Sequence, residues 1–145
     1  MSAVKHDAGL HAVLRVRSVR ERDSRLGLQQ ALAEQAGAQQ ALAGLHDAVA
    51  QSPALDQVGA AAFLALRQSV AGVSARLGEM SEEVSWRGTV ADQARARHAA
   101  DRSRERAVEM LLERRAAERA AERRRAEAKE ADDLTSARFG RGENA

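Results

Sequence analysis

The stretch FLALRQSVAGVSARLGEMSEEV, residues 63–84, decides the fold. Its large apolar residues recur at alternating spacings of three and four, at Phe63, Leu66, Val70, Val73, Leu77, Met80 and Val84. This period keeps the apolar side chains on one stripe of an α-helix, as at the a and d positions of a heptad, where they face a partner helix. The stretch therefore predicts a long coiled-coil helix.

A second stripe with the same spacing precedes the first in the chain. It consists of Leu28, Ala31, Gln35, Ala38, Leu42, Leu45 and Val49. This stripe is weaker, because glutamine and alanine occupy several of its positions. Two such stripes in one chain predict a helix that pairs with another helix of the same chain.

Ser52 and Pro53 form the strongest break between the two stripes. Proline lacks a backbone donor but is tolerated in the first turn of a helix, and serine is a favoured N-cap. A short break favours an antiparallel hairpin, and a compact helical bundle is the alternative. We expect an all-α fold, an antiparallel two-helix coiled-coil hairpin with a long C-terminal helix. Folding at Pro53 would place Val49 near Val58, and Val19 near Trp86.

We expect one coiled-coil domain over residues 1–145. Its predicted parts are a loose tail at 1–9, a first helix at 10–51, a turn at 52–54, a second helix at 55–138 and a frayed tail at 139–145. Glycines between Gly72 and Gly88 leave open whether the second helix is continuous, because glycine is a poor helix former.

The composition excludes several classes of protein. The chain has two Phe, one Trp, no Tyr and no Cys, so it lacks aromatic residues for a globular core and thiols for disulfides or zinc. No run alternates with the period of a strand, and no apolar run approaches the roughly 20 residues that span a bilayer. We expect a cytoplasmic protein with no direct membrane insertion.

No catalytic or metal-binding motif stands out in the sequence. There is no Gly-rich phosphate loop, and the histidines at 6, 11, 46 and 98 do not form the i, i+4 pairs of a helix-borne metal site. Exposed helices also do not build the closed pocket that catalysis needs. We predict a protein that is not an enzyme and has no cofactor and no metal.

Charge is concentrated in two clusters, from Arg15 to Arg25 and from Arg95 to Asp133. A hairpin folded at Pro53 would bring both clusters to one end and leave residues beyond about His98 without an intramolecular partner. This overhang is then either a solvated charged helix or a docking surface. Basic and acidic residues alternate there, which disfavours nucleic acid because carboxylates repel phosphate.

Two stretches of the chain resemble a known family. The sequence from Leu10 to Arg17 resembles the opening Leu-x-x-Val-Leu-x-x-Arg of the FliJ family of flagellar export proteins. The segment Leu112-Glu113-Arg114-Arg115 and the acidic, lysine-containing stretch from Glu127 to Leu134 resemble the end of that family. The likeness in length, central break and Arg/Glu-rich second helix extends over essentially the whole chain.

The resemblance implies a stalk-like coiled coil of the bacterial flagellar type III protein export apparatus. Such a protein binds the export ATPase ring and promotes its assembly, and it contacts the cytoplasmic domain of the export gate and the export chaperones. It is cytoplasmic and peripherally associated with the inner membrane at the flagellar base. Flagellum biogenesis and hence motility and chemotaxis depend on this apparatus.

We assign the charged end to the ATPase and the turn end to the gate, as a hypothesis. The residues at the ATPase end are Arg15, Arg17, Arg20, Arg22, Leu112, Arg114 and Arg115. The residues at the turn end are Leu42, Leu45, Val49, Phe63 and Leu66. The alternatives are a generic coiled-coil scaffold, a self-associating protein, or a helical protein associated with nucleic acid.

Overall fold

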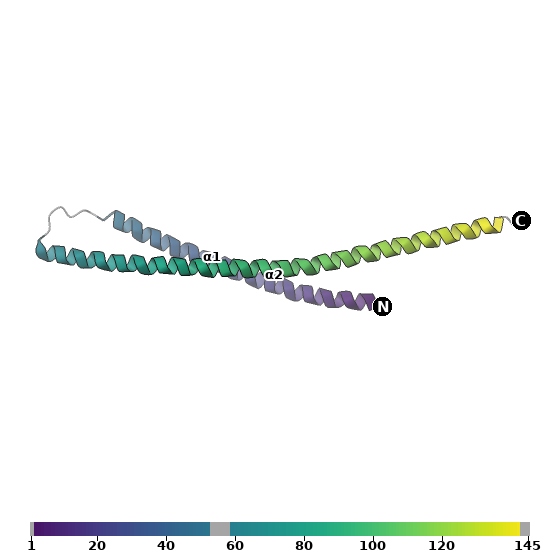
Figure 1. Ribbon diagram of the computed structural model, residues 1–145, viewed down its shortest axis with the longest axis horizontal. Helices are drawn as coiled ribbons and strands as arrows, with labels where there is room; N and C mark the ends of the chain where they lie inside the picture. Colours follow the sequence, from purple (N-terminus) through teal and green to yellow (C-terminus); the bar gives the residue numbers. More distant parts are fainter. Residues whose placement is uncertain (1, 53–58, 143–145) are drawn as a thin grey trace. The chain divides into compact units, whose positions relative to one another are not determined.

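The computed structural model describes the backbone of residues 2–52 and 59–142, and the side chains of residues 7–52 and 59–137. Helix α1 spans Ser2–Ala50 and helix α2 spans Ala60–Gly142 (Figure 1). No strand occurs among these residues. The chain therefore has the predicted all-α fold, with the long C-terminal helix that the sequence indicated.

The helix ends differ from the prediction. Helix α1 begins at Ser2 rather than at Leu10, and α2 runs without interruption through its glycines as far as Gly142. Ser52 donates its hydroxyl to the carbonyl of Ala48 at 3.0 Å, so it closes the end of α1. Its predicted role as N-cap of the second helix is wrong, because α2 begins at Ala60. Pro53 lies outside the described residues.

The chain divides into two units, of which unit 2 comprises Val19–Arg102. Within it α1 and α2 are antiparallel. Arg87 donates a hydrogen bond to Glu34, and Nδ1 of His98 lies 3.9 Å from Oε1 of Glu21. Residue numbers fall along α1 while they rise along α2, as an antiparallel hairpin requires.

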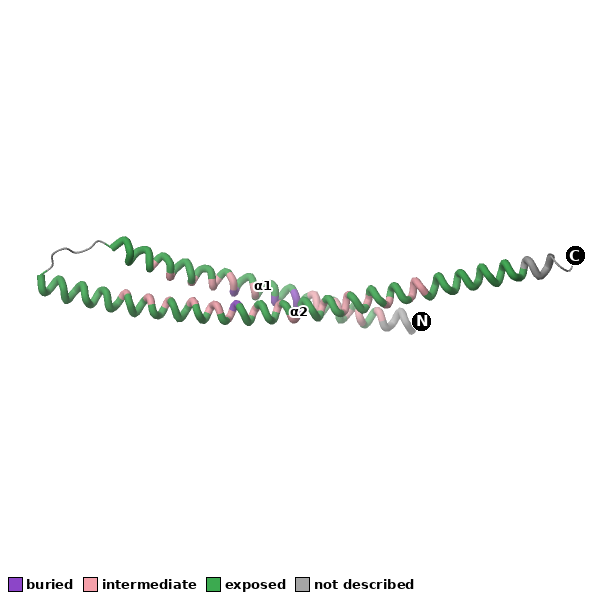
Figure 2. The backbone as a smooth tube through the Cα atoms, turned by 45° about the horizontal axis from the view of Figure 1, so that its top comes forward, coloured by how far each residue is buried: buried purple, intermediate pink, exposed green. Residues whose placement is uncertain are grey.

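Unit 2 has a seam of buried and half-buried side chains between the two helices (Figure 2). On α2 the seam continues from the predicted apolar residues into polar ones, through Val73, Leu77, Met80, Val84, Arg87, Ala91, Ala94, His98 and Asp101. On α1 it comprises Glu21, Ser24, Leu28, Ala31, Gln35, Ala38, Leu42 and Leu45. The alternating spacing of three and four is that of a coiled coil.

The predicted seam residues are confirmed in the middle of both stripes and not at their ends. Those from Leu28 to Leu45 and from Val73 to Val84 are buried or half-buried. By contrast, Val49, Phe63 and Val70 are exposed, as is Leu66 at 37%.

The predicted register was wrong. The Glu34–Arg87 pair places Trp86 at the level of Gln35 rather than of Val19, and Val58 lies outside the described residues. Because α2 starts later than expected, the pairing is centred further along the chain. In this register α1 ends at about the level of Gly72, and every described residue from Gly59 to Gly72 is exposed (Figure 2).

Unit 1 comprises Met1–Ser18 and Ser103–Ala145. Asp7 on α1 forms ion pairs with Arg115, at 3.6 Å, and with Arg119. The Ser18 hydroxyl donates to the carboxylate of Glu105 at 2.5 Å. Pairing thus extends to Arg119, and the expectation that residues beyond about His98 lack an intramolecular partner was wrong. Residues 122–137 are all exposed, so the actual overhang begins there.

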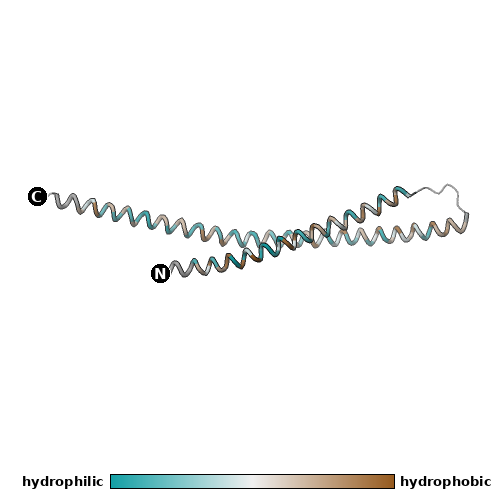
Figure 3. The backbone as a smooth tube through the Cα atoms, turned by 180° about the vertical axis from the view of Figure 1, so that it is seen from behind, coloured by the Kyte–Doolittle hydropathy of each residue, from teal (hydrophilic) through white to brown (hydrophobic). Residues whose placement is uncertain are grey.

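Apolar and polar residues are interspersed along both helices (Figure 3). Among the described residues, no helix has a stretch that is both apolar enough and long enough to span a membrane.

Candidate partner-binding surfaces

Four polar side chains occupy neighbouring seam positions in unit 2. Glu21, Ser24 and Asp101 are buried, and the side chain of His98 is only 18% exposed. The Ser24 hydroxyl donates to the Glu21 carbonyl at 3.0 Å, whereas Nδ1 of His98 has no hydrogen-bond partner among the described residues. Polar residues at such positions specify register at a cost in stability. We call these four residues the polar layer.

An ion-pair bridge joins the helices further along unit 2. Arg87 donates to Glu83 on its own helix at 2.6 Å, and to Glu34 on α1. The Glu83 carboxylate, with a smaller contribution from Glu34, raises the pKa of the Arg87 guanidinium. All three side chains are at least one-third exposed, so the bridge contributes little to stability. Its effect is to favour this register of the helices.

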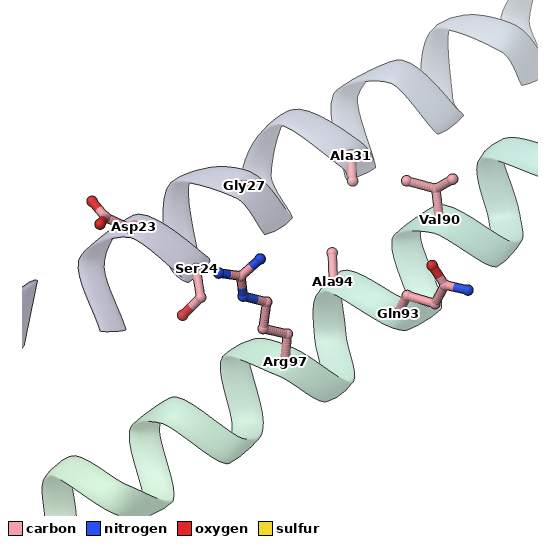
Figure 4. Close-up of a pocket in the computed structure, with 8 residues that line it drawn as sticks. All are labelled: Asp23, Ser24, Gly27, Ala31, Val90, Gln93, Ala94 and Arg97. Atoms are coloured by element: carbon pink, nitrogen blue, oxygen red, sulfur yellow. The ribbon is translucent and has the colours of Figure 1, made fainter. Parts of the chain in front are cut away.

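A groove of about 350 Å³ runs beside the seam in unit 2 (Figure 4). Its residues on α1 are Asp23, Ser24, Gly27 and Ala31, and those on α2 are Val90, Gln93, Ala94 and Arg97. The groove exists because three of the facing residues are glycine or alanine. A Cβ atom at Gly27 would meet no other atom within 4 Å, and the Arg97 side chain reaches toward Ser24 at one end (Figure 4).

The predicted ATPase-end residues lie in different environments. In unit 1 Arg15 is exposed, Arg114 binds Glu118 at 2.9 Å, and Arg115 is held by Asp7. The remaining two residues of this set in unit 1, Arg17 and Leu112, are half-buried. Arg20 and Arg22 belong to unit 2 and are exposed.

The predicted turn-end residues form two groups. Leu42 and Leu45 are half-buried in the seam and so offer little surface to another protein. Phe63 and Leu66 are exposed, at 54% and 37%, and lie on the part of α2 that has no α1 residue opposite. Val49 is exposed near the end of α1. The apolar surface at this end is therefore carried mainly by α2.

Sequence reasoning missed both the polar layer and the groove. The polar layer keeps the heptad spacing, but its residues give no hydrophobic signal. The groove depends on which small residues the register brings together, which the sequence pattern alone does not specify. The described residues contain no group of three or more His, Asp or Glu placed to hold a metal ion.

The family model for the flagellar FliJ protein matches residues 6–144 of this chain. No curated protein and no solved structure matches it. The match covers both helices and nearly the whole sequence. The chain therefore belongs to the FliJ family of flagellar export proteins.

Proposed function

We propose that this chain is a non-enzymatic stalk of the flagellar export apparatus, which binds the export ATPase ring and promotes its assembly. It also contacts the cytoplasmic domain of the export gate and the export chaperones, in the cytoplasm next to the inner membrane. Membership of the FliJ family supports a role in flagellar export. The resemblance of the two terminal stretches to that family supports the finer assignment.

The observation that carries the proposal is that α2 continues beyond the part that pairs with α1. In unit 1 the contacts of α1 with α2 extend to Arg119, and the exposed stretch 122–137 continues as a single charged helix. Two paired helices, each 10–12 Å wide with side chains, are about 20 Å across. Such a pair fits the central opening of a ring of subunits, and its single-helix extension offers charged groups to the same partner.

The two ends of the chain are assigned to different partners on the basis of surface chemistry. Exposed arginines, among them Arg15, Arg20 and Arg114, suit an acidic surface on the ATPase. Exposed apolar residues at the start of α2, Phe63 and Leu66, suit an apolar site on the gate. Burying an aromatic anchor is a common source of binding energy.

Charge reversal at the ATPase end tests this assignment. The variant Arg15→Glu/Arg17→Glu/Arg20→Glu should weaken binding to the export ATPase by at least about tenfold, or about 1.4 kcal/mol, because repulsion replaces attraction. Stimulation of ATP hydrolysis should fall in parallel, and binding to the gate domain should not change. Titration calorimetry and a phosphate-release assay measure these quantities.

The matched variant Phe63→Ala/Leu66→Ala should show the opposite pattern, with weakened gate binding and full ATPase stimulation. Arg76→Glu is the charge control, since Arg76 is an exposed arginine that pairs with Glu79 on its own helix. Circular dichroism checks that all variants keep their helical content. Full stimulation by the triple arginine variant would refute the assignment of the charged end.

A further inference from the structure

One face of α2 in unit 2 carries a stripe of residues outside the seam. Glu83, Trp86, Val90, Gln93 and Arg97 follow one another at spacings of three and four, so they lie on one side of the helix. The only tryptophan of the chain belongs to this stripe and is 60% exposed. Tryptophan is strongly enriched among the residues that dominate binding energy at interfaces. We call these five residues the outer stripe.

The groove beside the seam adjoins the outer stripe. Val90, Gln93 and Arg97 belong to both, while Gly27 and Ala31 form the opposite wall (Figure 4). The space at Gly27 is open, because an added Cβ atom would have no neighbour within 4 Å. The same face thus carries a large exposed aromatic side chain and, about one to three helical turns further along α2, a hollow.

Two outer stripes that run antiparallel to each other are complementary in charge and in shape. Glu83 and Arg97 carry opposite charges and lie seven residues before and after Val90. Trp86 lies before Val90 at about the distance at which Gln93, beside the hollow, lies after it. Glu83 already accepts a hydrogen bond from Arg87 through Oε1, but a carboxylate has two oxygens and can accept several.

If a two-fold axis through Val90 relates two copies of the chain, each complementary contact occurs twice. The axis would place Glu83 of each copy against Arg97 of the other, and Trp86 of each copy against the hollow at Gly27 of the other. Symmetric contacts of this kind are the commonest way in which identical chains associate. A partner of different sequence would need no such symmetry of charge, so the pattern favours a second copy of this chain.

We propose that two copies of this chain form an antiparallel dimer through the outer stripe and the groove. The proposal goes beyond the function in export: the dimer is a separate state of the chain from the single two-helix pair that is proposed to enter the ring. It assigns a role to Trp86, whose large exposed side chain the pairing of α1 with α2 does not use.

Sedimentation equilibrium over a range of concentrations tests the dimer. The chain of residues 1–145 should dimerise, and the fluorescence of Trp86 should shift to shorter wavelength as the dimer forms. Trp86→Ala should raise the dissociation constant at least tenfold. Gly27→Leu should do the same, because its side chain fills the hollow. The control is Leu134→Ala, which removes an equally exposed apolar residue outside this face.

Charge exchange makes the test specific for the antiparallel arrangement. Glu83→Arg and Arg97→Glu should each weaken the dimer about tenfold or more, whereas the double variant should restore it, because the two reversed charges face each other again. A chain that stays monomeric up to about 1 mM, the weak end of the affinity scale, would overturn the proposal. Dimerisation that none of these variants weakens would also overturn it, by excluding this face.

Discussion

Single residues in the seam of unit 2 show a conflict between stability and specificity. Glu21 and Asp101 are buried carboxylates in a row of positions that coiled coils usually fill with apolar side chains. Burying a charge is unfavourable unless it is well paired, and the nearest His98 nitrogen lies 3.9 Å from Glu21. Such residues favour one register, since a slip by one heptad would move Glu21 from His98 to the level of Ala91 or of Glu105.

The polar layer yields a prediction about stability. Replacing one pair of facing residues, as Glu21→Leu/His98→Leu, should raise the free energy of unfolding by about 1–3 kcal/mol, because two poorly paired polar groups give way to apolar contact. Urea denaturation followed by circular dichroism measures the change. The gain should come with a less uniquely defined register.

The single variant His98→Leu is the control for this prediction. It should lower stability relative to the double variant, because the Glu21 carboxylate stays buried without the imidazole that lies 3.9 Å from it. If the double variant unfolds more easily than the unchanged chain, the polar layer is a net source of stability and the interpretation fails.

At the scale of the helices, the sequence predicted which face of each helix is apolar, but it did not predict the register in which the two helices pair. The spacing from Val73 to Val84 and from Leu28 to Leu45 identified the correct faces, because apolar periodicity is a property of one helix at a time. The register depends on a sum of weak contacts, such as Arg87 with Glu34, between two stripes rich in Gln and Ala. That sum cannot be obtained from either stripe alone, and so the expected contact of Val19 with Trp86 was wrong.

The candidate site was predicted to a similar extent. The sequence named Arg15 and Phe63 as partner-binding residues; both are exposed, and their binding to a partner stays a prediction. It also selected Leu45, which is half-buried in the seam of unit 2, and Leu112, which is half-buried in unit 1. Apolar character alone does not separate a residue that binds the partner helix of the same chain from one that binds another protein.

The single-helix part of α2 gives a prediction at the same scale. A chain truncated after Ala121 should keep its urea midpoint within experimental error, because the described residues from 122 to 137 are all exposed and add no packing. Under the proposed function, its stimulation of the export ATPase should fall at least severalfold. A large drop in the urea midpoint would show that these residues contact the paired helices.

Across the whole molecule, few described side chains are fully removed from water. Ala31 and Ala91 are the buried apolar residues, whereas Trp86, Leu26 and several valines are more than 40% exposed. Burial of apolar surface is the main favourable term in folding. The free energy of unfolding should therefore lie near the low end of the 5–15 kcal/mol that is usual for domains.

When the free energy of unfolding is this small, the intrinsic helix preference of single residues changes it by a measurable fraction. The double variant Gly37→Ala/Gly78→Ala should raise the free energy of unfolding by up to about 2 kcal/mol, because each exposed helical glycine costs up to about 1 kcal/mol relative to alanine. A Cβ atom at either position would meet nothing within 4 Å, so no clash opposes the gain. Thermal unfolding measured by circular dichroism checks it, and an unchanged midpoint would contradict it.

The uncovered start of α2 has a consequence for the timing of encounters. No α1 residue lies opposite the segment from Ala60 to Gly72, so these turns can unwind and rewind without separating the two helices. Short helical segments change conformation in about a microsecond or less, much faster than two proteins usually find each other. The segment would therefore pass through its helical and unwound conformations many times during one encounter with a protein at Phe63. Binding to the helical conformation would then not be slowed by the refolding of the segment.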